Sequence, residues 1–244
     1  MNQKTILVTG ASRGIGRSIA LLFASKGWHV FLNCRSSIDD LKHTAKLIDE
    51  TTDGSYTLVP GDVGNPDDVR NMFRNIYEEC SSLDVLVNNA GVAHIGLLMD
   101  MSDSEWDKVI SSDLSSVFYC CREAVPKMVR KHEGCIINIS SMWGTVGASC
   151  EAAYSAAKSG IHGLTRALAK ELAPSGIPVN AIACGVIDTV MNSQLDTEER
   201  ADLEAEIPAG RFADPNEVAS LVWQLYQSPA YMTGQVLGID GGYI

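Results

Sequence analysis

The stretch VTGASRGIG, residues 8–16, decides the fold, because it joins a short apolar run to an amphipathic segment. Its three glycines are Gly10, Gly14 and Gly16, spaced as G-x-x-x-G-x-G. Glycine permits a tight turn and a close approach of the backbone to a bound group, and the amino terminus of the following helix attracts negative charge. The stretch therefore predicts a strand-to-helix turn that seats a phosphate.

Short apolar runs alternate with longer amphipathic segments along the chain. The runs are residues 6–8, 30–32, 85–87, 136–139, 179–183 and 236–239. Apolar residues at consecutive positions predict strands that are covered on both faces. The segment after the glycine turn ends at Gly27 and has a helical apolar side formed by Ile15, Ile19, Leu22 and Phe23. This alternation predicts an α/β fold, a Rossmann-type doubly wound parallel sheet of about seven strands with helices on both faces.

The sequence predicts one domain, residues 1–244. The chain is 45% hydrophobic, which is enough for one sizeable core, and no stretch marks a linker. Residues 186–212 depart from the alternation, since they combine Met191, Leu195 and Leu203 with many charges. Ligands of open parallel sheets bind beyond the carboxyl ends of the strands, so we expect this segment to cover a substrate. A packing insert is the alternative.

Composition argues against several classes of partner. A formal net charge of -11 repels a phosphate backbone, so nucleic acid is not an expected partner. We expect no membrane span and no signal peptide, because the apolar runs are short and the first residues enter a strand-like run. The seven cysteines form no C-x-x-C pair and the five histidines are scattered. We therefore expect reduced thiols, no metal site and a cytoplasmic protein.

A tyrosine and a lysine stand four positions apart in EAAYSAAKSGIHG, residues 151–163. Four positions is about one helical turn, so Tyr154 and Lys158 would project from the same face of a helix. A core-facing stripe supports that helix and consists of Ile161, Leu164, Leu168 and Leu172. Taken alone, the pair is more typical of a solvated helix face.

Several motifs in order make the whole chain resemble the short-chain dehydrogenase/reductase family. They are TGASRGIG at 9–16, NNAG at 88–91, serine at 141, Y-x-x-x-K at 154–158 and DGG at 240–242. Through DLSSVF, PAGRFADPNEVA and YMTGQVLGIDGG, the chain is most similar to the 3-oxoacyl-[acyl-carrier-protein] reductases. The resemblance implies an oxidoreductase of fatty acid biosynthesis, assembled as a homotetramer, that transfers hydride between a nicotinamide cofactor and a ketone.

The end of the second predicted strand indicates which nicotinamide cofactor binds. NAD-binding relatives usually place an acid there, whereas NADP-binding relatives offer arginine to the extra phosphate. Cys34 takes the place of the acid, Arg35 follows it, and Arg13 supplies a second guanidinium. Arginine fits phosphate geometry, so we expect NADP(H). Alternatively, both arginines are surface residues and Asp39 and Asp40 hold the diol, although these acids are better placed to open the next helix.

The remaining cofactor contacts lie, by resemblance, in the glycine turn and after later strands. Those in the turn are Gly10, Ser12, Arg13, Gly14, Ile15 and Gly16. Those from the adenine through the ribose to the nicotinamide are Asp62, Val63, Asn89, Ala90, Gly91, Ile187 and Thr189.

The resemblance assigns the chemistry to Ser141, Tyr154 and Lys158. Free tyrosine has a pKa of about 10, so the lysine ammonium should favour the phenolate and bring the pKa of Tyr154 closer to working pH. Tyr154 is then the general acid in reduction and the general base in oxidation. Lys158 also binds the nicotinamide ribose, and Ser141 hydrogen-bonds the substrate oxygen. The neighbouring Ser140 is expected to be structural.

Two residues depart from the family pattern near this set. Asp113 stands where the family usually has asparagine, which helps hold a water linking the lysine to solvent, and it is a further catalytic candidate. Its carboxylate should favour the charged form of Lys158. Cys184 replaces the usual proline after its strand, which frees the backbone or is neutral.

Three functions remain open. The first is an NADPH-dependent reductase of a ketone, of the 3-oxoacyl thioester type. The second is a hydroxysteroid or other secondary-alcohol dehydrogenase, because Met142 and Trp143 indicate a bulky pocket. The third is an NADP(H)-binding sensor with little turnover, prompted by Asp113 and Cys184.

One feature of the sequence argues against a carrier-protein substrate. Reductases that act on acidic carrier proteins commonly present arginines beside the site, where this chain has His132, Glu133 and Ser175. Arg130 and Lys131 are the candidates to replace them.

Overall fold

Seven parallel strands form one sheet in the order β3-β2-β1-β4-β5-β6-β7. The computed structural model describes residues 3–192 and 195–244. The strands are β1 (Thr5–Val8), β2 (His29–Leu32), β3 (Ser55–Leu58), β4 (Val85–Asn88), β5 (Cys135–Ser141), β6 (Val179–Cys184) and β7 (Val236–Ile239). The predicted α/β class with a doubly wound parallel sheet is confirmed.

The six apolar runs of the sequence do not include the strand β3. Its residues Ser55, Tyr56 and Thr57 are not a continuous apolar run, and each is only half-buried. The reason is its place at the edge of the sheet, where burial on both faces is not required. The six predicted runs all lie within observed strands, and the run at 236–239 coincides with β7.

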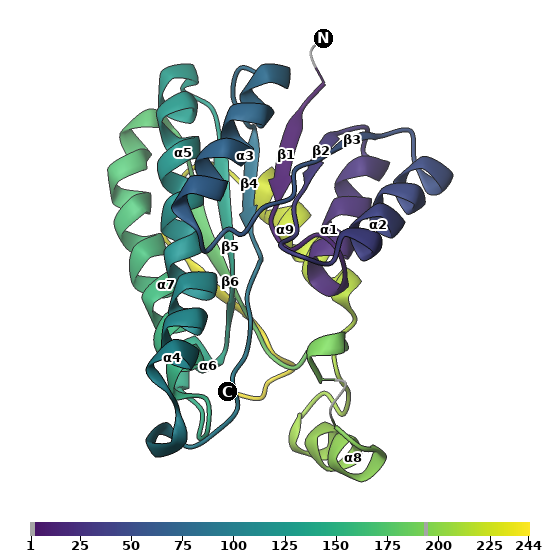
Figure 1. Cartoon of the computed structure of the whole chain (residues 1–244), viewed down its shortest axis with the longest axis vertical. Coiled ribbons are helices and arrows are strands. Elements are labelled where there is room, and N and C mark those ends of the chain that lie inside the picture. The colour runs from purple at the N-terminus through teal and green to yellow at the C-terminus, as the bar shows by residue number, and fades with distance from the viewer. Residues whose placement is uncertain (1–2, 193–194) are drawn as a thin grey trace.

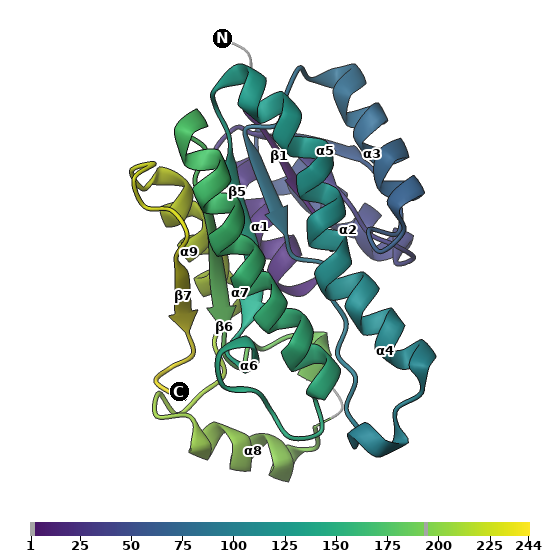
Figure 2. The ribbon, with the colours of Figure 1, turned by 90° about the vertical axis from the view of Figure 1, so that its left-hand side faces the viewer.

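Helices cover both faces of the sheet, as Figures 1 and 2 show. Their bounds are α1 (Gly14–Ser25), α2 (Ile38–Thr51), α3 (Pro66–Glu79), α4 (Asp103–Ile110), α5 (Ser116–Lys131), α6 (Trp143–Val146), α7 (Ala152–Leu172), α8 (Thr197–Glu206) and α9 (Pro215–Gln227). One hydrophobic core joins the sheet to α1, α2 and α9, and a second joins the opposite face to α3, α5 and α7. Alternate residues of β1 enter different cores, since Ile6 belongs to the first and Leu7 to the second.

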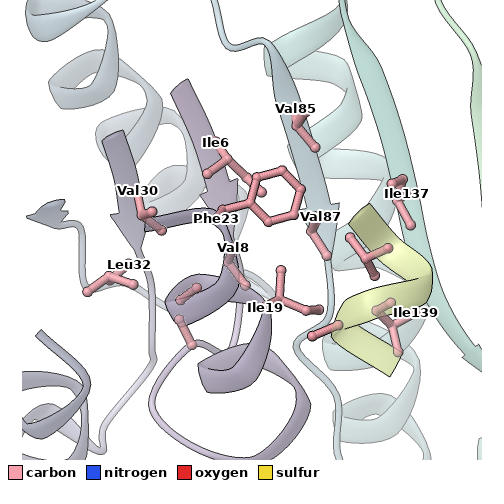
Figure 3. Packing of buried hydrophobic residues seen from close by; sticks show 14 of the residues in the cluster. Ile6, Val8, Ile19, Phe23, Val30, Leu32, Val85, Val87, Ile137 and Ile139 are labelled. Atoms are coloured by element: carbon pink, nitrogen blue, oxygen red, sulfur yellow. The ribbon is translucent and has the colours of Figure 1, made fainter. Parts of the chain in front are cut away.

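Phe23 is the centre of the aromatic packing in the first core. Figure 3 shows its ring between α1 and the strands that carry Ile6 and Val87. It is fully buried and packs edge-to-face against Trp28 and Trp223, with ring centroids 5.1 Å apart in both cases. This contact fixes α1, and with it the glycine turn, against α9.

The two helices expected from apolar stripes are observed as α1 and α7. On α7, Ile161 and Leu172 are buried, whereas Leu164 and Leu168 are only partly buried at the margin of the second core. Asp39 and Asp40 lie in the first turn of α2, as expected for acids at a helix amino terminus. Among the described helices, none combines the length and apolar character that crossing a membrane would require.

Phe23→Ala should lower the free energy of unfolding by about 3–5 kcal/mol, because it empties a fully buried aromatic site. Chemical denaturation followed by circular dichroism measures the change. Tyr231, which is 100% exposed, provides the control, since Tyr231→Ala should change stability by about 0.5 kcal/mol or less. Similar small losses in both variants would contradict the central position of Phe23.

Candidate active site

A cavity of about 900 Å³ opens at the carboxyl edge of the sheet, on the side where Figure 1 shows α8. Its walls come from the turns after β1, β2, β4, β5 and β6 and from the first turns of α7. Every predicted site residue except Gly16 lines this cavity, namely Gly10, Ser12, Arg13, Gly14, Ile15, Arg35, Asp62, Val63, Asn89, Ala90, Gly91, Asp113, Ser141, Tyr154, Lys158, Ile187 and Thr189. The structure thus brings together residues that the sequence spreads over 180 positions.

Gly16 lies behind the glycine turn and does not line the cavity. A Cβ atom at this position would stand 2.2 Å from the carbonyl oxygen of Gly10, so a larger residue would push the turn apart. Gly10 and Gly14 have φ values of 66° and 54°, in the left-handed region that favours glycine. Gly16 therefore shapes the turn by close packing.

The residues around the glycine turn fit a nucleotide with an extra phosphate. The helix α1 begins at Gly14, so its unpaired amino-terminal N–H groups lie beside the cavity. Arg13 and Arg35 are both exposed at the same end of the cavity, and Arg35 Nη1 is 3.9 Å from Asp62 Oδ2. Cys34 is buried and offers no carboxylate there. Ser36 and Ser37 also line this end, although no motif had indicated them.

Tyr154, Lys158 and Ser141 meet at the opposite end of the cavity. Tyr154 and Lys158 lie one turn apart on α7, and Lys158 Nζ is 5.2 Å from the centroid of the tyrosine ring. Ser141 is the last residue of β5, and its Oγ accepts a hydrogen bond of 3.2 Å from the backbone N–H of Trp143. A phenol, a hydroxyl and an ammonium thus converge on one space.

Ser140 makes different contacts from its neighbour. Its hydroxyl is 2.9 Å from Nε2 of His162 and donates to the Lys158 carbonyl oxygen at 3.3 Å. Ser140 is buried and ties β5 to α7. These contacts suit the structural role expected of it.

Asp113 is fully buried beside Lys158 in a π-helical turn, Ser111–Ser115, that joins α4 to α5. Its Oδ1 accepts a hydrogen bond of 2.8 Å from the Val92 backbone N–H. Its Oδ2 lies 3.2 Å from Lys158 Nζ, so the two groups form an ion pair, but their alignment is too poor for a hydrogen bond. The Lys158 ammonium also donates to the Ile139 carbonyl oxygen at 3.3 Å.

The pKa of Lys158 is raised, even though burial alone would lower it, because the Asp113 carboxylate attracts the ammonium. This agrees with the expectation for a carboxylate in place of asparagine. Burial raises the pKa of Asp113 and Lys158 opposes that rise.

The pKa of Tyr154 is raised, which corrects the expected net direction. Burial is the largest cause, since it disfavours the phenolate. Lys158 does lower this pKa, as expected, and a hydrogen bond with Ser141 lowers it further, but the negative charge of Asp113 raises it. The sequence reveals the neighbouring Lys158 charge but not the burial of the Tyr154 phenol.

Beyond Tyr154, the cavity wall carries apolar residues and the carboxylate of Glu151. Ile95, Met142 and Trp143 line it from one side, and residues of the 186–212 segment from the other, including Met191, Leu195 and Leu203. The described part of that segment contains α8 and a short turn at Val190–Asn192, and residues 193–194 lie outside the described residues. Glu151 supplies the carboxylate.

Cys184 ends β6 in the cavity wall. Burial raises its pKa to about 12, so it is a neutral thiol at neutral pH. Arg130 and Lys131 end α5 at the opposite edge of the sheet, where Lys131 pairs with Asp84. They do not line the cavity of their own chain.

Comparisons with known proteins identify one family and several relatives. A model of the family described as short chain dehydrogenase matches residues 4–200. A 3-oxoacyl-[acyl-carrier-protein] reductase, FabG, of Staphylococcus aureus is 42% identical over 98% of this chain and 97% of its own, and the same-named protein of Vibrio cholerae is 39% identical over 98% and 96%. The uncharacterized oxidoreductase YmfI of Bacillus subtilis is 35% identical over 98% of both chains.

One solved structure shows the same fold. A crystal structure from Agrobacterium tumefaciens, assigned provisionally as a gluconate dehydrogenase, superposes with a TM-score of 0.91 and 33% identity. The match covers 98% of this chain and 95% of the other.

Asp113→Asn should shift the rising limb of the pH–rate profile for alcohol oxidation to lower pH. The substitution removes a negative charge that raises the pKa of Tyr154, so the phenolate forms at lower pH. Initial rates measured across the pH range with one alcohol and saturating cofactor test this. Superimposable profiles for the variant and the wild type would make Asp113 a structural residue only.

Proposed function

This chain belongs to the short-chain dehydrogenase family, and we propose that it is an NADPH-dependent reductase that transfers hydride to a ketone. The family and its relatives make it an oxidoreductase acting on CH–OH and C=O groups. One observation carries the proposal, the convergence of the Tyr154, Ser141 and Lys158 polar groups in a cavity that continues to the glycine turn.

In the proposed reaction, the chain's own residues orient the carbonyl and supply the proton. A bound nicotinamide supplies the hydride to the carbonyl carbon. The Ser141 hydroxyl donates a hydrogen bond to the carbonyl oxygen, and the Tyr154 hydroxyl transfers its proton to the same oxygen. The Lys158 ammonium stabilises the tyrosinate that remains. In oxidation the tyrosinate accepts the proton from the alcohol.

The environment of Tyr154 favours the protonated phenol near neutral pH. Its raised pKa keeps the phenol protonated, which is the form that a general acid requires. Oxidation requires the phenolate, which burial and Asp113 disfavour. The protonated phenol therefore suits the proposed reduction of a ketone.

Two arginines support NADPH over NADH. Arg13 and Arg35 lie at the end of the cavity where the second strand ends, and Cys34 leaves that place without a carboxylate. A guanidinium attracts the extra phosphate, whereas a carboxylate there would repel it and bind the ribose diol instead.

The relatives support a 3-oxoacyl thioester as the ketone, since those named as 3-oxoacyl-[acyl-carrier-protein] reductases match nearly the whole chain. Another ketone is the second candidate, because the substrate end of the cavity carries Trp143 and Glu151 and the residues Arg130 and Lys131 lie at the far edge of the sheet. A sensor without turnover is the third, opposed by the convergence of Ser141, Tyr154 and Lys158.

We also propose a cytoplasmic homotetramer. Phe118 on α5 is 47% exposed and the C-terminal Ile244 is 50% exposed, and both are apolar surfaces that contact with other subunits would bury. All seven cysteines are free thiols, in keeping with a reducing compartment.

Arg35→Ala and Arg13→Ala should each raise the KM for NADPH about 10- to 100-fold, since each removes a charged hydrogen bond worth about 1.5–3 kcal/mol. The KM for NADH should change little. Steady-state kinetics with both cofactors measure the preference, and Arg70→Ala, an exposed arginine on α3, is the control. A wild-type enzyme that uses NADH as well as NADPH would refute the cofactor assignment.

Tyr154→Phe should lower kcat by at least about a hundredfold, because the proton donor is removed. NADPH binding, followed by cofactor fluorescence, should persist because the cavity keeps its shape. Tyr231→Phe changes an exposed tyrosine in the same way and should keep full activity. Substantial turnover in Tyr154→Phe would reject the mechanism.

A further inference from the structure

Glu151 places a carboxylate in the wall of the catalytic cavity, one helical turn before the proton donor. It is half-buried at the residue preceding α7 and lines the cavity together with Tyr154 and Trp143. Both side chains line the same cavity, so the carboxylate and the phenol flank one volume. Its side chain does not cap α7.

This carboxylate has no cationic partner within the part of the chain that the structure describes. Burial raises the pKa of Glu151, and the neighbouring Trp143 side chain lowers it in part. Lys158, a cationic side chain at this end of the cavity, is paired elsewhere, since it lies 3.2 Å from Asp113. A half-buried carboxylate without a counter-charge is unfavourable, and a cation in the cavity would compensate it.

The surroundings of the cavity mouth also favour a cation. The helix α8, whose Leu203 lines the cavity, has five acidic residues and a single basic one, Arg200. That arginine is neutralised by two hydrogen bonds of 3.0 Å to the Asp188 carboxylate and one of 3.0 Å to Glu204. Figure 2 shows α8 at the same end of the molecule as α6, the helix that begins at Trp143.

Aromatic rings complete the surroundings of Glu151. Trp143 packs edge-to-face against Tyr243, with ring centroids 5.8 Å apart, which holds the indole beside the carboxylate. A carboxylate beside an aromatic side chain is a favourable site for an ammonium group. At the other end of the same cavity, Arg13 and Arg35 provide positive charge for the nucleotide. The cavity thus has positive side chains at the nucleotide end and a negative side chain, Glu151, at the other end.

We propose that Glu151 is a specificity-determining residue, and that the substrate of this enzyme is a ketone that carries an ammonium group on a short arm. This rests on the proposed ketone reduction and favours a ketone other than the 3-oxoacyl thioester of the relatives. The ammonium pairs with the Glu151 carboxylate beside the Trp143 side chain while the carbonyl faces Tyr154. An anionic substrate is repelled by the same carboxylate and by α8.

Two ketones of the same shape and different charge test this proposal. 4-(Aminomethyl)acetophenone is a cation at neutral pH and cannot cyclise, and 4-ethylacetophenone is its neutral isostere. With NADPH, the wild type should show a kcat/KM at least about tenfold higher for the cation, as expected for one compensated charge. Glu151→Gln should abolish most of that preference. Glu171→Gln removes an exposed carboxylate from the far end of α7 and should preserve the preference within about twofold.

A binding measurement separates this inference from the reaction itself. Calorimetric titration with benzylammonium, which cannot be reduced, should show binding to the wild type and to Glu171→Gln and a loss of at least about tenfold in Glu151→Gln. Benzyl alcohol is the neutral control ligand. Binding of benzylammonium without reduction of either ketone would remove the ketone-reductase proposal and retain the cation site. Equal kcat/KM for the two ketones, or equal benzylammonium binding in wild type and Glu151→Gln, would overturn the inference.

Discussion

The site depends on a buried ammonium held between a carboxylate and a phenol. Lys158 has lost its hydration, and the ion pair with Asp113 keeps its pKa above the ordinary value. Removing one partner of such a buried pair typically costs about 3–5 kcal/mol, because the other charge is left uncompensated. The same ammonium opposes the rise in the pKa of Tyr154 that burial causes. The balance between burial and these two charges sets how readily the tyrosine gives up its proton.

The fold brings this charged group to the cofactor because all seven strands are parallel. The carboxyl ends of β1, β4 and β5 lie side by side at one edge, so the glycine turn after β1 and Ser141 at the end of β5 open on the same cavity. The order reverses between β1 and β4, the place where ligands of such sheets bind. The close contact of Gly16 with Gly10 and the packing of Phe23 hold the turn against the sheet. The packing that stabilises the core therefore also positions the glycine turn beside the catalytic residues.

Sequence reasoning succeeded where function or burial imposes a local pattern. The glycine spacing, the four-residue interval between Tyr154 and Lys158 and the doubly buried strands can all be read in order along the chain. It failed for β3, since an edge strand needs no continuous apolar run. The net direction of the pKa of Tyr154 depends on burial by distant segments. Glu151 belongs to no motif, and only the cavity reveals its charge beside the proton donor.

The most direct test of the account is the loss of NADPH absorbance when the wild-type protein meets a panel of ketones. The panel should contain an acetoacetyl thioester, a ketosteroid and a small ammonium-bearing ketone. The account predicts that at least one of them consumes NADPH and yields an equal amount of alcohol. Tight binding of NADPH with no consumption by any ketone would contradict it and would favour a protein that senses the cofactor without turning it over.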